Sequence, residues 1–214
     1  MNHQFLLLFV FINGYVLLLI LCEFLNRRRN IASENTRKLA HFVSSMSVLL
    51  FPHVFQDDVY VLTICAISFV MLLVSNKMNM LHSIDEVGRK TGGSYLLALS
   101  VGIIYYISVK QGNSILFTLP ILILAICDPL AGIVGKCFNS KHILNGKSMA
   151  GSLTFLFSSL CISLFYLSTA HYKLEFTLSL VIAFTASITE LLSPRGTDNV
   201  TIPLVVAGVL ILCG

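Results

Sequence analysis

Charged side chains are scarce in this sequence. Only 11% of the 214 residues are Asp, Glu, Lys or Arg, whereas 56% are hydrophobic. Soluble domains carry roughly 25% charged residues, so a water-soluble globular protein is excluded. The sequence predicts a polytopic membrane protein. The net charge of +4 does not indicate nucleic-acid binding, because the basic residues fall in short segments between apolar runs.

Paired cysteines are also missing. The six cysteines are scattered, without a CxxC pair or a His/Cys metal spacing, so neither a disulfide framework nor a zinc site is expected. The first apolar run ends at Arg27-Arg28-Arg29 and has no small-residue cleavage site, so a cleavable signal is not predicted. Internal repeats and low-complexity tracts are absent. We expect one membrane domain over residues 1–214, with a peripheral first span at 4–25 and a core at about 36–204.

Long apolar runs dominate the rest of the chain. They lie at about residues 4–25, 39–55, 59–75, 94–109, 114–126, 150–170, 176–192 and 200–213. These runs predict an all-α, polytopic transmembrane helical bundle with about seven or eight spans. Several runs are shorter than the ~20 residues that cross a bilayer, so we expect their helices to extend into the neighbouring polar motifs or to cross a thin, protein-packed region.

The positive charges predict an orientation. With the N-terminus outside, all but two of the 14 Lys and Arg residues fall in cytoplasmic segments, which satisfies the positive-inside rule. The two exceptions are Lys110 and Lys173. This orientation places every unusual polar motif on the cytoplasmic side.

The most informative polar segment is residues 127–152, CDPLAGIVGKCFNSKHILNGKSMAGS. It contributes Asp128, Gly132, Gly135, Gly146, Lys147, Ser148, Gly151 and Ser152. Glycine amides beside a lysine suit a phosphate group, and a nearby carboxylate suits a divalent cation. An ordinary solvated loop also contains such residues. Gly146-Lys147-Ser148 is not a P-loop, because Lys141 stands where that motif requires glycine and no strand precedes it.

Three further basic residues and one histidine are candidates. Arg37 and Lys38 precede the second span, where they serve either as membrane anchors or as phosphate ligands. His41 shares their helix face and enters the apolar run, which makes it a functional candidate. Arg89 adjoins Gly92-Gly93, and its planar guanidinium suits an anion.

Acidic residues flank the last predicted turn. Glu190 lies near the end of an apolar helix, and Asp198-Asn199 opens the next one. The turn between them brings the two acids together, which is typical of a divalent-cation site. Asp198 is also a suitable helix N-cap. Glu190 has no such structural explanation, because an unpaired carboxylate in an apolar helix is costly.

Taken in order, these motifs resemble the polyprenol kinase family, which includes dolichol, phytol and farnesol kinases and a CTP-dependent diacylglycerol kinase. The resemblance covers residues from about Arg37 to Pro203. The middle and final motifs are also similar to those of phosphatidate cytidylyltransferases. Two features differ: family members often have Gly-Asp where this chain has Cys127-Asp128, and eukaryotic dolichol kinases are longer.

The resemblance implies transfer of the γ-phosphate of CTP to a membrane lipid alcohol, with Mg²⁺ or another divalent cation. It assigns Asp128, Glu190 and Asp198 to the metal and the attacking hydroxyl. Lys147, Ser148, Ser152 and Gly132, Gly135, Gly146 and Gly151 would hold phosphates. Arg37, Lys38 and Arg89 would stabilise the transferring group, His41 would orient the hydroxyl or a phosphate oxygen, and Asn199 would contact these groups or the cytosine. A bacterial inner membrane is favoured over the endoplasmic reticulum.

Three other functions remain open at this point. A cytidylyltransferase would use CTP but release pyrophosphate. A small anion transporter would also place ionisable residues in the membrane, but it predicts inverted repeats, which are not found. A membrane scaffold would not need the clustered acids and Lys147.

Overall fold

The computed structural model describes residues 3–78, 80–81, 83, 92–138, 140–172, 175–194 and 196–213. Over these residues the chain is helical. The helices are α1 His3–Arg29, α2 Ser33–Val48, α3 Phe51–Val54, α4 Asp58–Met78, α6 Gly93–Gln111, α7 Ile115–Cys137, α8 Met149–Thr169, α9 Glu175–Leu192 and α10 Asp198–Cys213. The prediction of an all-α, polytopic helical bundle is confirmed. Arg89 lies outside the described residues.

Six of these helices are long and apolar enough to cross a membrane: α1, α4, α6, α7, α8 and α9. The shorter α10 is apolar as well, and α2 with α3 occupies the position of the second predicted span. The fifth predicted run is extended, because α7 continues through Asp128 to Cys137. The motif after Cys127 is therefore helical at its start, which is the first of the two outcomes expected for the short runs.

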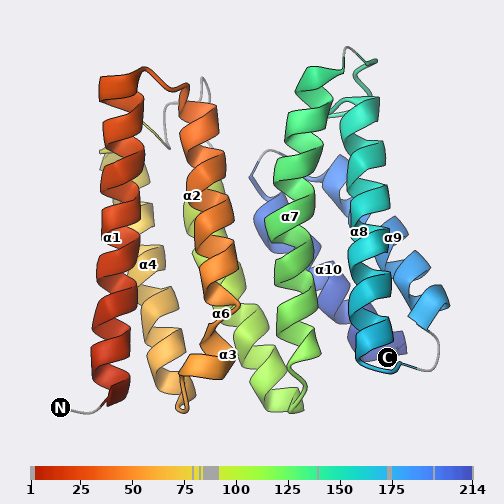
Figure 1. Ribbon diagram of the computed structural model, residues 1–214, viewed down its shortest axis with the longest axis horizontal. Coiled ribbons are helices and arrows are strands. Elements are labelled where there is room, and N and C mark those ends of the chain that lie inside the picture. The colour runs from red at the N-terminus through yellow and green to blue at the C-terminus, as the bar shows by residue number, and fades with distance from the viewer. Residues whose placement is uncertain are drawn as a thin grey trace.

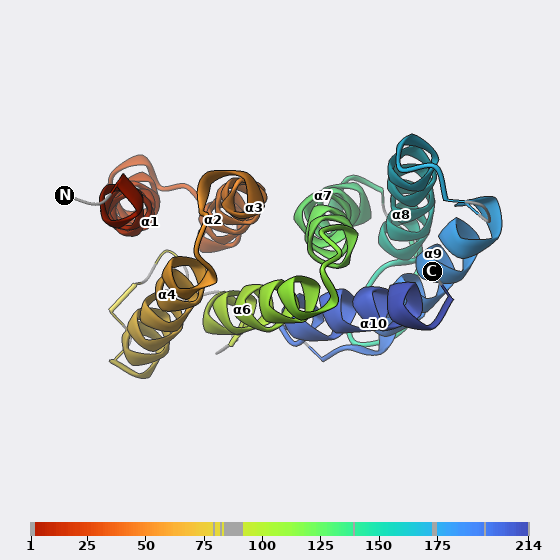
Figure 2. The same cartoon turned by 90° about the horizontal axis from the view of Figure 1, so that it is seen from below.

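The helices form two layers. One layer contains α1, α2, α7 and α8, and the other contains α4, α6, α10 and α9 (Figures 1 and 2). α7 lies near the middle and α1 at one edge. In the most apolar stretch of α7 half of the residues are buried, compared with 6% in α1. The interior is therefore organised around α7.

Local sequence explains where several helices end. α6 stops at Gly112, which takes a left-handed conformation with φ +61° that favours glycine. α8 begins after Ser148, whose hydroxyl accepts a hydrogen bond from the Gly151 amide at 3.2 Å as a helix N-cap. Pro52 lies in the first turn of α3, where its missing N–H is tolerated.

Basic residues gather at one end of the bundle. They close α1 (Arg27, Arg28, Arg29), α4 (Lys77) and α7 (Lys136), open α2 (Arg37, Lys38) and precede α8 (Lys147). Lys110 closes α6 at the opposite end. This one-sided distribution matches the charge pattern on which the predicted orientation depends.

Candidate active site

Three charged side chains, one from the turn before α8 and one each from α9 and α10, meet at the basic end of the bundle. The Lys147 ammonium lies 2.6 Å from Oε1 of Glu190 and 3.6 Å from Oδ2 of Asp198. Lys147 also donates to the Glu190 carbonyl. The three side chains are between 7% and 17% exposed, so this ion pairing is shielded from bulk water. A buried cation thus joins the end of α9 to the start of α10.

A short turn positions Lys147. Asn145 and Gly146 have positive φ of 53° and 76°, and Ile143 donates from its amide to the Lys147 carbonyl at 2.8 Å. The Asn145 side-chain amide lies 3.2 Å from both the Leu191 and Leu192 carbonyls. These bonds attach the turn before α8 to the last turn of α9, which fixes Lys147 beside Glu190.

Asp128, from the middle motif, belongs to the same group. It interacts electrostatically with Glu190 and with Asp198. We call Asp128, Lys147, Glu190 and Asp198 the charged cluster. Its members are up to 70 positions apart in the sequence, yet α7, α8, α9 and α10 bring them together.

Arg37 and His41 from α2 border the charged cluster. Arg37 interacts electrostatically with Asp198 and with His41, and His41 interacts with Asp128. Lys38 contacts α7, because a side chain at Gly132 would clash with the Lys38 ammonium. α2 therefore supplies positive charge beside the acids.

Several polar atoms in this region are buried without a hydrogen-bond partner among the described residues. They are Nε of Arg37, Nε2 of His41, Oγ of Ser152 and Oε2 of Glu190. Seven serine hydroxyls elsewhere in the described residues are unpartnered too, so the groups that set this site apart are the ionisable ones of Arg37, His41 and Glu190. A buried ionisable group without a partner is costly, and a polar ligand at this site would supply the missing partners.

Glycines let α7 and α8 approach closely here. A Cβ on Gly151 would lie 2.9 Å from the Ala131 carbonyl oxygen, and one on Gly135 would lie 2.5 Å from Oγ of Ser148. The Gly151 amide is already bonded to Ser148. Gly135 and Gly151 thus have a packing role, and their assignment to phosphate binding remains a prediction. Ser148 and Ser152 lie at the N-terminus of α8, where the helix dipole favours anions.

Sequence reasoning missed Glu34 in the first turn of α2. Its carboxylate lies 2.5 Å from the Lys136 ammonium and 3.5 Å from that of Lys38. Partial burial alone would raise the pKa of Glu34, but its interactions with Lys136 and Lys38 outweigh burial and lower the pKa. The (i, i+4) spacing to Lys38 was a readable signal, whereas the contact with Lys136 depends on how α2 packs against α7.

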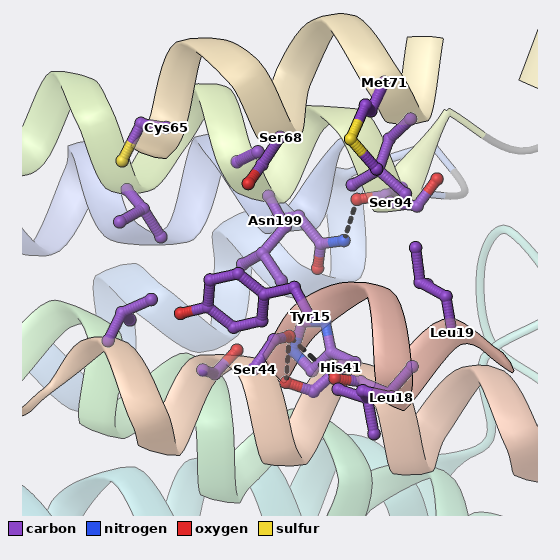
Figure 3. A pocket seen from close by; sticks show the side chains of 18 of the residues that line it. Tyr15, Leu18, Leu19, His41, Ser44, Cys65, Ser68, Met71, Ser94 and Asn199 are labelled. Carbon is purple, nitrogen blue, oxygen red and sulfur yellow. Dashed lines mark hydrogen bonds between the residues drawn. The ribbon is translucent and has the colours of Figure 1, made fainter. Parts of the chain in front are cut away.

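An apolar cavity adjoins the charged cluster. It lies between α1, α2, α4 and α6, and its walls include Tyr15, Leu19, Phe51, Ile64, Leu97 and Val101. Its polar lining includes Arg37, His41 and Asn199. Figure 3 shows Asn199 and Ser94 toward one side of this cavity, with Tyr15 lying across it. Because Asn199 directly follows Asp198, and Arg37 interacts with Asp198, the cavity leads to the charged cluster.

Asn199 connects the two regions. Its side-chain amide donates to the Gly93 carbonyl at 2.7 Å, which ties α10 to the start of α6. A Cβ on Gly93 would lie 3.1 Å from the Asn199 amide nitrogen and 3.6 Å from the Arg37 guanidinium. The absence of a side chain at Gly93 therefore allows α6, α10 and α2 to approach closely at the polar side of the cavity.

The carboxylates suit a divalent cation in part. Within the described ranges, no group of three or more His, Cys, Asp and Glu residues is arranged to hold a metal ion. Mg²⁺ needs only one or two protein carboxylates, because water and phosphate oxygens supply its other ligands. Glu190 and Asp198 already stabilise one cation, the Lys147 ammonium, and Glu190 has a free buried oxygen. The binding of Mg²⁺ by these acids remains a prediction.

Comparison with known proteins places the chain in a family. It is 31% identical over 191 residues to the phytol kinase of Synechocystis sp., and the match covers 85% of this chain and 80% of that protein. The chain belongs to the polyprenol kinase family, which includes phytol kinases. The predicted resemblance is thereby confirmed, and the chain is a membrane-embedded lipid alcohol kinase by family.

A shorter match involves an uncharacterised protein of Rickettsia prowazekii (strain Madrid E). The two chains are 40% identical over 85 residues, which covers 39% of this lipid alcohol kinase homologue and 41% of the relative. No protein-family model matches the chain. No solved structure matches it either.

Proposed function

We propose that this protein transfers the γ-phosphate of CTP to the hydroxyl of a membrane isoprenoid alcohol or of diacylglycerol. The observation that carries the proposal is the junction of an apolar cavity with a cluster of buried charges. A lipid alcohol has an apolar chain and one reactive hydroxyl, whereas a nucleotide has a highly charged triphosphate. The cavity and the charged cluster match these two substrates separately and adjoin at Arg37, His41 and Asn199.

In the reaction, the alcohol oxygen forms a bond to the γ-phosphorus while the bond between that phosphorus and the β–γ bridging oxygen breaks. The nucleoside diphosphate leaves, and the hydroxyl proton passes to a carboxylate. Such reactions depend mainly on positioning and on neutralisation of phosphate charge.

The residues of this chain divide these tasks. Lys147, Ser148 and Ser152 bind the β- and γ-phosphates, and Arg37 and Lys38 stabilise charge on the transferring group. His41 orients the hydroxyl, because its unpaired Nε2 is buried on the cavity lining. We assign Asp128, Glu190 and Asp198 to the divalent cation and to the proton. A bound Mg²⁺ supplies neutralising charge for the phosphates.

We place the site on the cytoplasmic side, because the basic end of the bundle carries nearly all of the positive charge. CTP is available there, and the alcohol reaches the same site from the inner leaflet. The membrane is a bacterial inner membrane.

The test uses the purified protein in vesicles with CTP, ATP, GTP and UTP in turn. The alcohols are farnesol, phytol, undecaprenol, dolichol and diacylglycerol. Label on the γ-phosphate is expected in the lipid product when CTP is the donor. Incorporation of α-phosphate label instead, with release of pyrophosphate, would establish a cytidylyltransferase. If none of the five alcohols is phosphorylated, the proposal is refuted.

A further inference from the structure

A second cavity lies between α1 and α4, next to the first. Its walls come from the half of each helix that is nearer the basic end, and they include Val16, Ile20 and Phe24 on α1 and Val70 and Val74 on α4. We call it the α1–α4 groove. Its lining is almost entirely apolar along its length, and Glu23, Arg27 and Arg28 lie at its polar end.

The walls of the α1–α4 groove reach the outer surface of the bundle. Ile20 is 58% exposed, Phe24 51% and Val70 55%. Because α1 and α4 are both long and apolar enough to cross the membrane, these side chains contact lipid. The groove therefore adjoins the hydrocarbon of the bilayer.

Three side chains line both cavities: Leu19, Met71 and Leu72. They form the partition between the groove and the apolar cavity that leads to Arg37 and His41. A leucine or methionine side chain moves by rotamer changes without breaking a hydrogen bond, so this partition can open at low cost.

α1 has little buried surface. Among its described residues only Gln4 and Cys22 are buried. Its polar end is anchored by Glu23, which accepts a hydrogen bond from the Ser83 amide at 3.0 Å and pairs with Arg27. Toward its other end α1 is also attached, because the Gln56 amide donates to Oε1 of Gln4 at 3.1 Å and Phe11 packs against Phe51 and Phe55. The groove therefore opens through movement of its side chains and not through displacement of the whole helix.

We propose that the α1–α4 groove is the lateral entrance through which the lipid alcohol passes from the bilayer into the apolar cavity, with Leu19, Met71 and Leu72 as its gate. This inference rests on the proposed function. The occupant is a lipid alcohol, because the groove is apolar along its length, carries polar groups at its basic end, and shares the wall residues Leu19, Met71 and Leu72 with the cavity whose polar lining we assign to the hydroxyl.

The test bridges the entrance reversibly. Ile20→Cys and Val74→Cys are introduced together after the exposed Cys137, Cys161 and Cys213 are replaced by serine. A bifunctional methanethiosulfonate reagent then links α1 to α4, and a reducing agent removes the link. Each single-cysteine variant, treated identically, is the matched control.

The order of addition separates entry from chemistry. Phytol bound before bridging is expected to be phosphorylated for one turnover. Phytol added after bridging is expected to react at least tenfold more slowly until the bridge is reduced. Equal rates for phytol added before and after bridging would overturn the proposal, and so would a bridge that also abolishes the first turnover.

A second comparison avoids cross-linking. Ile20→Trp narrows the groove without touching the inner cavity, and it should lower kcat/KM for phytol several-fold while leaving the KM for the nucleotide unchanged. Leu17→Trp is the control, because Leu17 is 65% exposed on the same helix and lines neither cavity. Equal decreases of kcat/KM for phytol in Ile20→Trp and Leu17→Trp would overturn the proposal that the groove is the entrance. If the unmodified protein phosphorylates no alcohol, the proposed function is refuted, and the proposed entry through the α1–α4 groove is refuted with it.

Discussion

The two halves of the bundle differ in what they enclose: one encloses charged side chains and the other an apolar cavity. The half formed by α7, α8, α9 and α10 buries charge: Lys147 lies between Glu190 and Asp198, and Asp128 is near both acids. The half formed by α1, α2, α4 and α6 surrounds an apolar cavity instead. The halves are joined where Asn199 bonds to Gly93 and where Arg37 approaches Asp198.

This difference explains how one small membrane protein handles two dissimilar substrates. A triphosphate requires fixed charges and tightly packed helices, whereas a lipid chain requires apolar space and walls that can move. The close contact of α7 and α8 at Gly135 and Gly151 meets the first requirement. The flexible side chains of Leu19, Met71 and Leu72 between α1 and α4 meet the second.

The largest effect is expected when the charged half loses its cation. Lys147→Ala leaves two buried carboxylates unpaired and removes a phosphate ligand, so transfer should fall by about 100-fold or more. Lys141→Ala is the control, because Lys141 is exposed in the same turn. Membrane insertion and the transfer rate are measured together. An unchanged transfer rate in Lys147→Ala would show that Lys147 does not act in phosphate transfer.

The packing of the charged half can be tested with two glycines. At Gly151 an added Cβ would press on the Ala131 carbonyl, so Gly151→Ala should destabilise the protein by about 1–3 kcal/mol. At Gly208 nothing lies within 4 Å, so Gly208→Ala should be neutral or stabilising by up to about 1 kcal/mol. Thermal unfolding in detergent gives both values. Equal shifts for the two variants would show that α7 and α8 are less closely packed than described.

Substitutions in the apolar half should change the preference among lipid alcohols. The Tyr15 side chain lies across the cavity (Figure 3). A 3.0 Å hydrogen bond between the Tyr15 and Ser47 hydroxyls holds it there. Tyr15→Ala lengthens the accessible cavity, so the ratio of kcat/KM for a longer alcohol to that for farnesol should rise several-fold. The KM for the nucleotide should not change. Leu17→Ala is the matched control, and an identical alcohol profile for Tyr15→Ala and the unmodified protein would contradict this reading of the cavity.

The smallest effect is expected outside both regions. Glu34 is about one-third exposed and pairs with Lys136 and Lys38. Glu34→Gln should cost less than about 1 kcal/mol, because exposed ion pairs contribute little. It should alter transfer less than threefold. A much larger loss of transfer would mean that Glu34 acts in the site.

Much of the fold was predictable because the hydrocarbon of a bilayer demands long apolar helices. The short run that ends at residue 126 also predicted that its helix continues into the Asp128 motif, and α7 reaches Cys137. The approach of Glu190 to Asp198 was predictable from the short turn between their helices, whereas the pairing of both acids with Lys147 depends on how the turn before α8 packs and was not predicted.

The lipid side of the protein was not predictable in the same way. The first span was expected to be peripheral, and α1 lies at the edge of the bundle, yet Tyr15, Leu18 and Leu19 line the cavity. Apolar side chains in a membrane helix look alike whether they face lipid or a cavity. Only the packing of α1 against α2 and α4 distinguishes these two environments.

The most direct test of the whole account is the effect of Asp198→Asn on transfer of labelled γ-phosphate from CTP to phytol in vesicles. This change keeps the shape of the side chain and its capacity to accept the hydrogen bond from the Asn199 amide but removes one negative charge from the charged cluster. The account predicts a loss of about 100-fold or more, with Asp57→Asn, in an exposed position outside the helices, unaffected. Turnover of Asp198→Asn at the rate of the unmodified protein would contradict it.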